Sequence, residues 1–210
     1  GSAVGLAVDA QDHVFVVHRI DSFTARTETG ADADPPIGTC CKSAPPVLEF
    51  DADGKLVNSW GGPGQGYTWP AIPTGIAVDP KGNVWIAGSG GMDAQVLVFT
   101  HEGKFVRQIG TAGAAGGSGR AGRATADTAY QGVSPGATGA PAAGRGGRGG
   151  RGGRGGPPPS MPPNSASMEM FGGATRIAFD ASGATAFIAD GARNHRVAIV
   201  DAMSGKITKV

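Results

Sequence analysis

The sequence has no long apolar run, few cysteines and almost no net charge. No stretch approaches the roughly 18 apolar residues that a membrane-spanning helix needs, so no membrane segment is expected. Its two cysteines, Cys40 and Cys41, are adjacent, and this spacing fits neither a zinc site nor a haem attachment site. Two thiols in a surface loop, or pairing with cysteines of a longer protein, both remain open. A formal net charge of +1 argues against a strongly charged partner.

The chain does contain three copies of one unit. The first half of the unit stands at 3–19, 72–88 and 173–191, and its second half at 47–61, 96–110 and 197–210. Each copy alternates short apolar segments with turns rich in glycine, aspartate and asparagine. The pattern predicts four strands per unit, which is typical of a β-propeller blade. We therefore expect an all-β fold with about three four-stranded blades, part of a six-bladed ring.

Matching positions of the three units predict matching roles. Asp9, Asp79 and Asp180 each end a first strand, where an aspartate side chain commonly binds the backbone of its own turn. The second strands carry Phe15, Trp85 and Phe187 at one shared position, and we expect these aromatic side chains to pack between blades.

Two insertions divide the chain. Residues 1–110 hold blades one and two, with an insertion at 20–46, and residues 171–210 hold blade three, incomplete at its C-terminus. Residues 111–170 are mostly Gly, Ala, Pro, Ser and Arg, and are expected to be disordered because they cannot bury enough apolar surface. Propellers close with about four to eight blades. Further blades or a second copy are therefore expected to complete the ring.

The segment Arg193-Asn194-His195-Arg196-Val197 resembles the Asn-His-Leu signature of NHL repeats, and 75–87 is similar to the first half of such a repeat. The resemblance implies a six-bladed propeller that binds proteins, RNA or small ligands. It also implies that His195 fills a structural position of the repeat.

A narrower resemblance joins 14–19, which ends in His18-Arg19, to the peptidyl-hydroxyglycine α-amidating lyase propeller. It implies that Arg19 faces the central cavity. That family holds zinc through histidines just before the inner strands, where this chain has Thr74 and Thr175, and its catalytic tyrosine position is Ala192. The sequence therefore predicts no metal site and no cofactor, and it does not favour an enzyme. A zinc lyase whose ligands lie outside this segment remains an alternative.

Polar residues follow the second strand of each blade, and equivalent loops of successive blades converge on one face of a propeller. The predicted ligand-binding residues are His18, Arg19, Asp21, Ser89, Asp93, Asp190, Arg193 and Asn194. Arginine can clamp a carboxylate in bidentate fashion, which suits Arg19 to a peptide terminus or small acid. The alternative is that these side chains only solvate the channel mouth. No nucleophile–base pair is evident, so no catalytic residue is predicted.

Arginines also recur in a Gly-Gly-Arg tract, at Arg145, Arg148, Arg151 and Arg154. Such tracts bind RNA through charge and stacking, but almost no aromatic residues are interleaved here. RNA binding is therefore the third alternative. The favoured function is a binding or scaffold module that takes a protein, peptide or small ligand on the channel face, without nucleic acid or membrane. The compartment stays open, a periplasmic or secreted location of a longer protein being one alternative.

Overall fold

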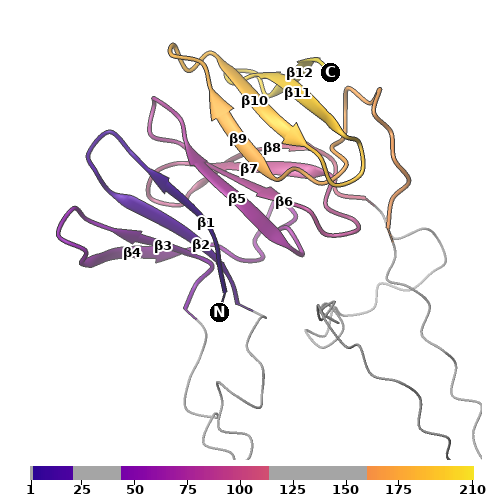
Figure 1. Ribbon diagram of the computed structural model, residues 1–210. Coiled ribbons are helices and arrows are strands. Elements are labelled where there is room, and N and C mark those ends of the chain that lie inside the picture. The colour runs from indigo at the N-terminus through magenta and orange to yellow at the C-terminus, as the bar shows by residue number, and fades with distance from the viewer. Residues whose placement is uncertain (1, 21–43, 114–159) are drawn as a thin grey trace, which may run out of the picture.

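The computed structural model describes residues 2–20, 44–113 and 160–210, which form three four-stranded antiparallel sheets and no helix (Figure 1). Blade one contains β1 (Ser2–Val8), β2 (Val14–Arg19), β3 (Val47–Phe50) and β4 (Leu56–Trp60). Blade two contains β5 (Pro73–Val78), β6 (Val84–Gly88), β7 (Gln95–Phe99) and β8 (Phe105–Gly110). Blade three contains β9 (Arg176–Phe179), β10 (Thr185–Asp190), β11 (Arg196–Asp201) and β12 (Lys206–Lys209). Strands are hydrogen-bonded in chain order within each sheet, as in propeller blades.

The turn between the first and second strand of each blade is built around its aspartate. Asp9 Oδ1 accepts the backbone N–H of His13 at 2.8 Å, Asp79 Oδ1 that of Asn83 at 2.9 Å, and Asp180 Oδ1 that of Thr185 at 3.0 Å. The predicted structural role of these aspartates is confirmed. Asp79 also accepts a hydrogen bond at Oδ2 from Trp85 Nε1, at 3.0 Å.

The innermost strands β1, β5 and β9 lie side by side, so that the blades fan out from one edge (Figure 1). Glycine makes this approach possible at Gly75, where a Cβ atom would lie 2.5 Å from the backbone oxygen of Thr175 in the next blade. Antiparallel pairing with side chains of period two then gives every blade two faces, and blade two directs one face toward each of its neighbours.

Two junctions hold the core. The first junction, between blades one and two, buries Phe15, Val17, Val47, Ile76, Val84, Ile86, Leu97 and Phe99. The second junction, between blades two and three, buries a cluster that includes Trp85, Val96, Val98, Phe171, Ile188 and Val200. Phe15 and Trp85 thus pack between blades, as predicted.

Phe187 holds the same register position and is 39% exposed, because the structure describes no further blade on that side; its packing between blades stays a prediction. Its side chain lies on the face of blade three turned away from blade two, because the next residue, Ile188, is the one that enters the second junction. The opposite face of blade one similarly exposes Leu6 and Val8. No described residue covers either face. That further blades or a second copy complete a ring stays a prediction.

The two insertions are described only in part. The first connects β2 to β3, as predicted, but 21–43, with Asp21, Cys40 and Cys41, lie outside the described residues. Residues 114–159, with the Gly-Gly-Arg tract, also lie outside them. The end of the second insertion, 160–170, contacts the blades: the Nη1 of Arg196 donates to the backbone oxygens of Ser165 and Ser167. In the described part of the chain, no helix is present that could cross a membrane.

Candidate binding site on the channel wall

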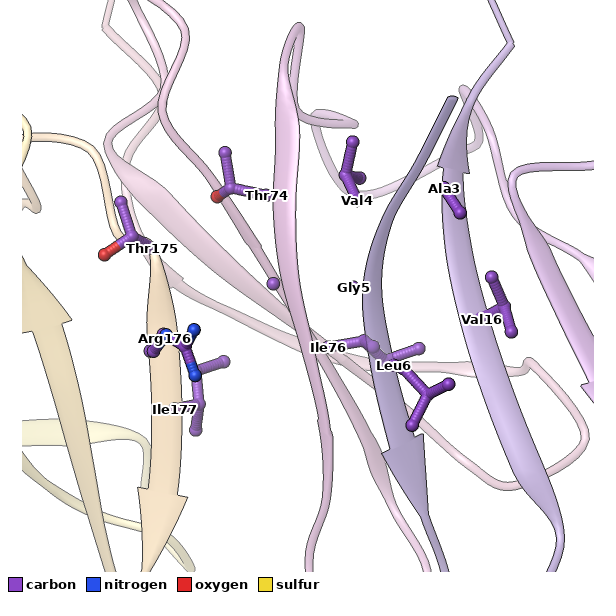
Figure 2. A pocket seen from close by; sticks show the side chains of 11 residues that line it. Ala3, Val4, Gly5, Leu6, Val16, Thr74, Ile76, Thr175, Arg176 and Ile177 are labelled. Carbon is purple, nitrogen blue, oxygen red and sulfur yellow. The ribbon is translucent and has the colours of Figure 1, made fainter. Parts of the chain in front are cut away.

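A concave cavity of about 570 Å³ lies where the innermost strands of the three blades meet (Figure 2). Its wall is formed by β1, β5, the start of β9, and Val16 of β2. Apolar side chains such as Leu6, Ile76 and Ile177 share the lining about equally with polar groups. Concave, mainly apolar surfaces with a few polar groups are the usual form of ligand sites. The centre of the propeller segment is therefore the first place to look for a ligand.

Two threonines stand in this wall at the positions where the lyase resemblance would require zinc-binding histidines. Thr74 Oγ1 donates to the backbone oxygen of Ala174 at 2.8 Å, and Thr175 Oγ1 donates to that of Ala189 at 3.2 Å. The first of these bonds crosses from blade two to blade three. Their hydroxyl protons are used to hold the innermost strands in place.

One cation faces the cavity without a partner. Arg176, at the start of β9, is exposed, and its side chain forms no hydrogen bond or ion pair with the described residues (Figure 2). The other described arginines all donate hydrogen bonds to the chain: Arg19, Arg107, Arg193 and Arg196. Sequence reasoning missed Arg176. A signal was present, because the same position in blades one and two is glycine, Gly5 and Gly75.

The predicted residues of blade one lie at the end of β2. His18 is buried, and its Nε2 lies 2.8 Å from the backbone oxygen of Pro45, where the chain returns from the first insertion. Arg19 Nε donates to the backbone oxygen of Pro73 at 3.4 Å, linking β2 to the start of β5. Both side chains join segments that are distant in the sequence.

Asp93 of blade two is buried and organises its loop. Its carboxylate accepts three backbone N–H groups, from Ala71 at 2.9 Å, Ile72 at 3.0 Å and Gly90 at 2.7 Å. Ser89 is half-buried in the same loop, and its backbone N–H donates to Ile72. This carboxylate is therefore occupied in holding the connection between β6 and β7 against the chain before β5.

Of the predicted residues of blade three, Asp190 and Asn194 bond each other, and Arg193 bonds blade two. The Asp190 carboxylate is fully buried and accepts hydrogen bonds from Asn194 Nδ2 and Arg196 Nε, each at 2.8 Å. Arg193 reaches into blade two, where its Nη atoms donate to the backbone oxygens of Gly90 and Asp93. The binding role predicted for these residues stays a prediction, but their polar atoms already hold neighbouring loops together.

His195 does not fill a packing position. Its side chain is exposed, and its φ of 51° places it in the left-handed region, as the turning residue between β10 and β11. The neighbouring Asn194 is the buried member of the pair. The structural position implied by the repeat resemblance is thus supplied by Asn194 through its side chain and by His195 only through its backbone.

Comparison with known proteins adds little to this picture. No protein-family model matches the chain, so the NHL repeat remains a resemblance. No curated protein matches it either. Among solved structures, the chain is similar to hydrazine synthase of Kuenenia stuttgartiensis, with a TM-score of 0.44 and 15% sequence identity. The similarity covers 98% of this chain and 35% of that one, so the chain spans little more than a third of the other's length.

Proposed function

We propose that this chain is a propeller-type binding module that holds an anionic ligand against the channel wall through Arg176. The observation that carries the proposal is a guanidinium group that has no partner among the described residues and borders a cavity of about 570 Å³. A guanidinium presents parallel N–H donors that match a carboxylate or phosphate in bidentate fashion. Its position at the centre of the blades is where propellers commonly take ligands.

The apolar wall narrows the class of ligand. Leu6 and Ile76 border the same cavity as Arg176, and the threonine hydroxyls donate to backbone oxygens. A compact inorganic anion would leave that apolar surface unused. We therefore favour a ligand with one carboxylate next to an apolar group, such as the C-terminus of a peptide or a small organic acid.

The test compares peptides with free and amidated C-termini. Fluorescence anisotropy is measured on labelled tetrapeptides that end in Leu or Phe, with the wild-type chain and with Arg176→Gln. Hydrogen bonds to a charged group contribute about 1.5–3 kcal/mol, so Arg176→Gln is expected to weaken binding about 10- to 100-fold. Amidated peptides should bind as weakly to the wild-type chain.

Lys209→Gln is the matched control, since it removes one positive charge from β12, outside the cavity. This control should bind the free peptides like the wild-type chain. Equal affinities for free and amidated peptides, equal losses in the two variants, or no saturable binding at all would contradict the proposal.

The two other functions raised by the sequence gain no support from the described residues. The zinc-lyase alternative places its metal ligands outside this segment; within it, Thr74 and Thr175 stand at the ligand positions and hydrogen-bond the backbone. The RNA alternative depends on arginines at 145–154, which lie outside the described residues.

A further inference from the structure

Four ionisable side chains converge at the edge of the first junction. Asp9 and His13 come from the turn between β1 and β2, Glu49 from β3, and His101 from the turn between β7 and β8 in the next blade. His13 Nδ1 lies 2.6 Å from Glu49 Oε1, and His101 Nε2 lies 3.0 Å from Asp9 Oδ2 and 3.5 Å from Glu49 Oε1. One ligand atom each of Asp9, His13 and His101 fall within 4.8 Å of one another. We call these four residues the junction cluster.

The two carboxylates of the cluster are buried and the two imidazoles reach solvent. The side chains of Asp9 and Glu49 are 2% and 3% exposed, whereas His13 and His101 are 30% and 32% exposed. The His101 ring packs edge-on against Phe15, with 5.1 Å between ring centroids. Two buried carboxylates need compensating positive charge, because an unpaired charge in the protein interior is strongly destabilising.

Hydrogen bonds now supply part of that compensation. The hydrogen bond to Glu49 raises the pKa of His13 above its ordinary value, although burial acts in the opposite direction. Burial acts to raise the pKa of Asp9, but hydrogen bonds from the His13 backbone and the His101 side chain outweigh it and lower that pKa. The carboxylates thus face the imidazole nitrogens directly.

The repeat provides an internal control for what packing alone requires. Glu49 occupies the position that Val98 and Ile199 hold in the other blades, as the pairing of each with the second-strand aromatic shows. His13 stands where blade two has Asn83, and His101 stands where blade one has Ala52 in the corresponding turn. Each of the three departs from the repeat, and the three departures meet at one place.

The second junction shows the same backbone without the cluster. There Asp79 Oδ2 accepts hydrogen bonds from Asn83 Nδ2 at 2.9 Å and Trp85 Nε1 at 3.0 Å, and Val98 is buried with apolar neighbours. The blade architecture is therefore complete without an imidazole or a second carboxylate at this position. A reason beyond packing is needed for His13, Glu49 and His101 at the first junction.

We propose that Asp9, His13, Glu49 and His101 form a binding site for a divalent transition-metal ion, with Zn²⁺ as the best match. Imidazole nitrogen and carboxylate oxygen are both common zinc ligands, and four protein ligands are the number found in closed, structural zinc sites. With bonds of about 2.0–2.2 Å, tetrahedral ligands are separated by roughly 3.3–3.6 Å. Three separations within the cluster, 2.6, 3.0 and 3.5 Å, are near or below this spacing, and one ligand atom each of Asp9, His13 and His101 lies within 4.8 Å of the other two.

An ion at this position would link two blades. Three of its ligands belong to blade one and the fourth, His101, to blade two, so binding stabilises only the arrangement in which the first junction is formed. The site lies at the opposite end of β2 from Arg19, because His13 precedes the strand and Arg19 ends it. The ion is therefore a clip between blades and is separate from the proposed channel-wall function.

The test uses metal-free chain in a Cys40→Ser, Cys41→Ser background, so that thiols do not compete for the ion. Zn²⁺ is titrated calorimetrically, Co²⁺ is used for its tetrahedral visible absorption, and Tm is recorded with and without Zn²⁺. We expect one equivalent of Zn²⁺, a tetrahedral Co²⁺ spectrum and a rise in Tm. No stoichiometric binding, or a Co²⁺ spectrum typical of octahedral coordination, would overturn the proposal.

The variants are taken from the repeat itself, so that each new residue is one that a neighbouring blade already accommodates. Glu49→Val and His101→Ala should each weaken Zn²⁺ binding at least about 100-fold, more than the 10- to 100-fold typical of losing a residue that only orients a ligand. His195→Asn, which removes an exposed histidine outside the cluster, should bind like the parent. Circular dichroism of the metal-free variants shows whether they are folded. His101→Ala, in a partly exposed turn, keeps the test valid if Glu49→Val does not fold. Unchanged affinity in a folded His101→Ala variant would contradict the site.

Discussion

The two junctions between blades have the same backbone and different chemistry. At the second junction, the Trp85 ring lies against Phe179 with 5.2 Å between centroids, and its N–H is bound by Asp79. At the first, Phe15 takes the same register position but meets His101, beside the buried Glu49. The blade repeat therefore determines the direction of a side chain, but its chemical type and its contacts differ between blades. Residues that depart from the repeat are the informative ones, as Arg176 also illustrates.

The largest effect is expected from the aromatic residue of the second junction. Trp85 is fully buried, and replacing a buried tryptophan or phenylalanine by alanine costs about 3–5 kcal/mol through lost contacts and a residual cavity. Trp85→Ala should lower the free energy of unfolding by this amount, measured by urea denaturation. Phe15→Ala makes the same change at the first junction. A loss below about 1 kcal/mol in Trp85→Ala would show that the second junction is not held by its apolar contacts.

A smaller effect is expected where the innermost strands approach each other. In Gly75→Ala the new Cβ would lie 2.5 Å from the backbone oxygen of Thr175, which cannot move unless β9 does. Overpacking of this kind costs about 1–3 kcal/mol. In Gly5→Ala the nearest atom, at 2.9 Å, is the side-chain Cγ1 of Val17, and the nearest backbone atom is the nitrogen of Ile76 at 3.2 Å. The free energy of unfolding, measured by urea denaturation, should therefore fall more in Gly75→Ala than in Gly5→Ala. The reverse order would contradict the closer approach of backbone inferred at Gly75.

The smallest effect on stability is expected at Asp180. Its turn in blade three contributes no residue to the junction cluster or to the cavity. Hydrogen bonds from the Thr185 backbone and the Ser182 side chain lower its pKa below the ordinary value of 3.8. A lowered folded-state pKa gives stability that is present above 3.8 and is lost as the pH falls through the folded-state pKa. Asp180→Asn should therefore be slightly less stable than the parent at pH 7.

The difference between parent and Asp180→Asn should shrink as the pH is lowered below 3.8, in urea midpoints measured from pH 7 to pH 3. A difference that stays constant across this range would mean that the charge of Asp180 contributes nothing to the turn. Because the group is exposed, the effect is expected to be well below that of either glycine variant.

Sequence reasoning succeeded where the repeat itself carried the information. The strands, the three turn aspartates and the inward position of Phe15 and Trp85 all follow from a pattern that recurs in register. The same reasoning stays a prediction at Phe187, because a repeat implies a neighbour on each side of every blade. In the described part of the chain, blade three has a neighbour on one side only.

The functional candidates were harder to predict, since polar residues in converging loops bind each other as readily as a ligand. Asp93 and Asp190 were selected for their position, and the structure shows both carboxylates buried and hydrogen-bonded within the chain. The junction cluster escaped notice because Glu49 and His101 belong to different blades and are 52 positions apart, the difference between 101 and 49. Only the register between blades brings them together.

The composition of the junction cluster limits how it could be inherited. Copying the first repeat alone would carry Asp9, His13 and Glu49 into a new blade without His101, and copying the second would carry His101 without its partners. The site can be passed on only with an adjacent pair of repeats in their original order. In a protein built by duplicating a single unit, such a set of residues distinguishes the boundary between blades one and two from the boundaries between otherwise similar blades.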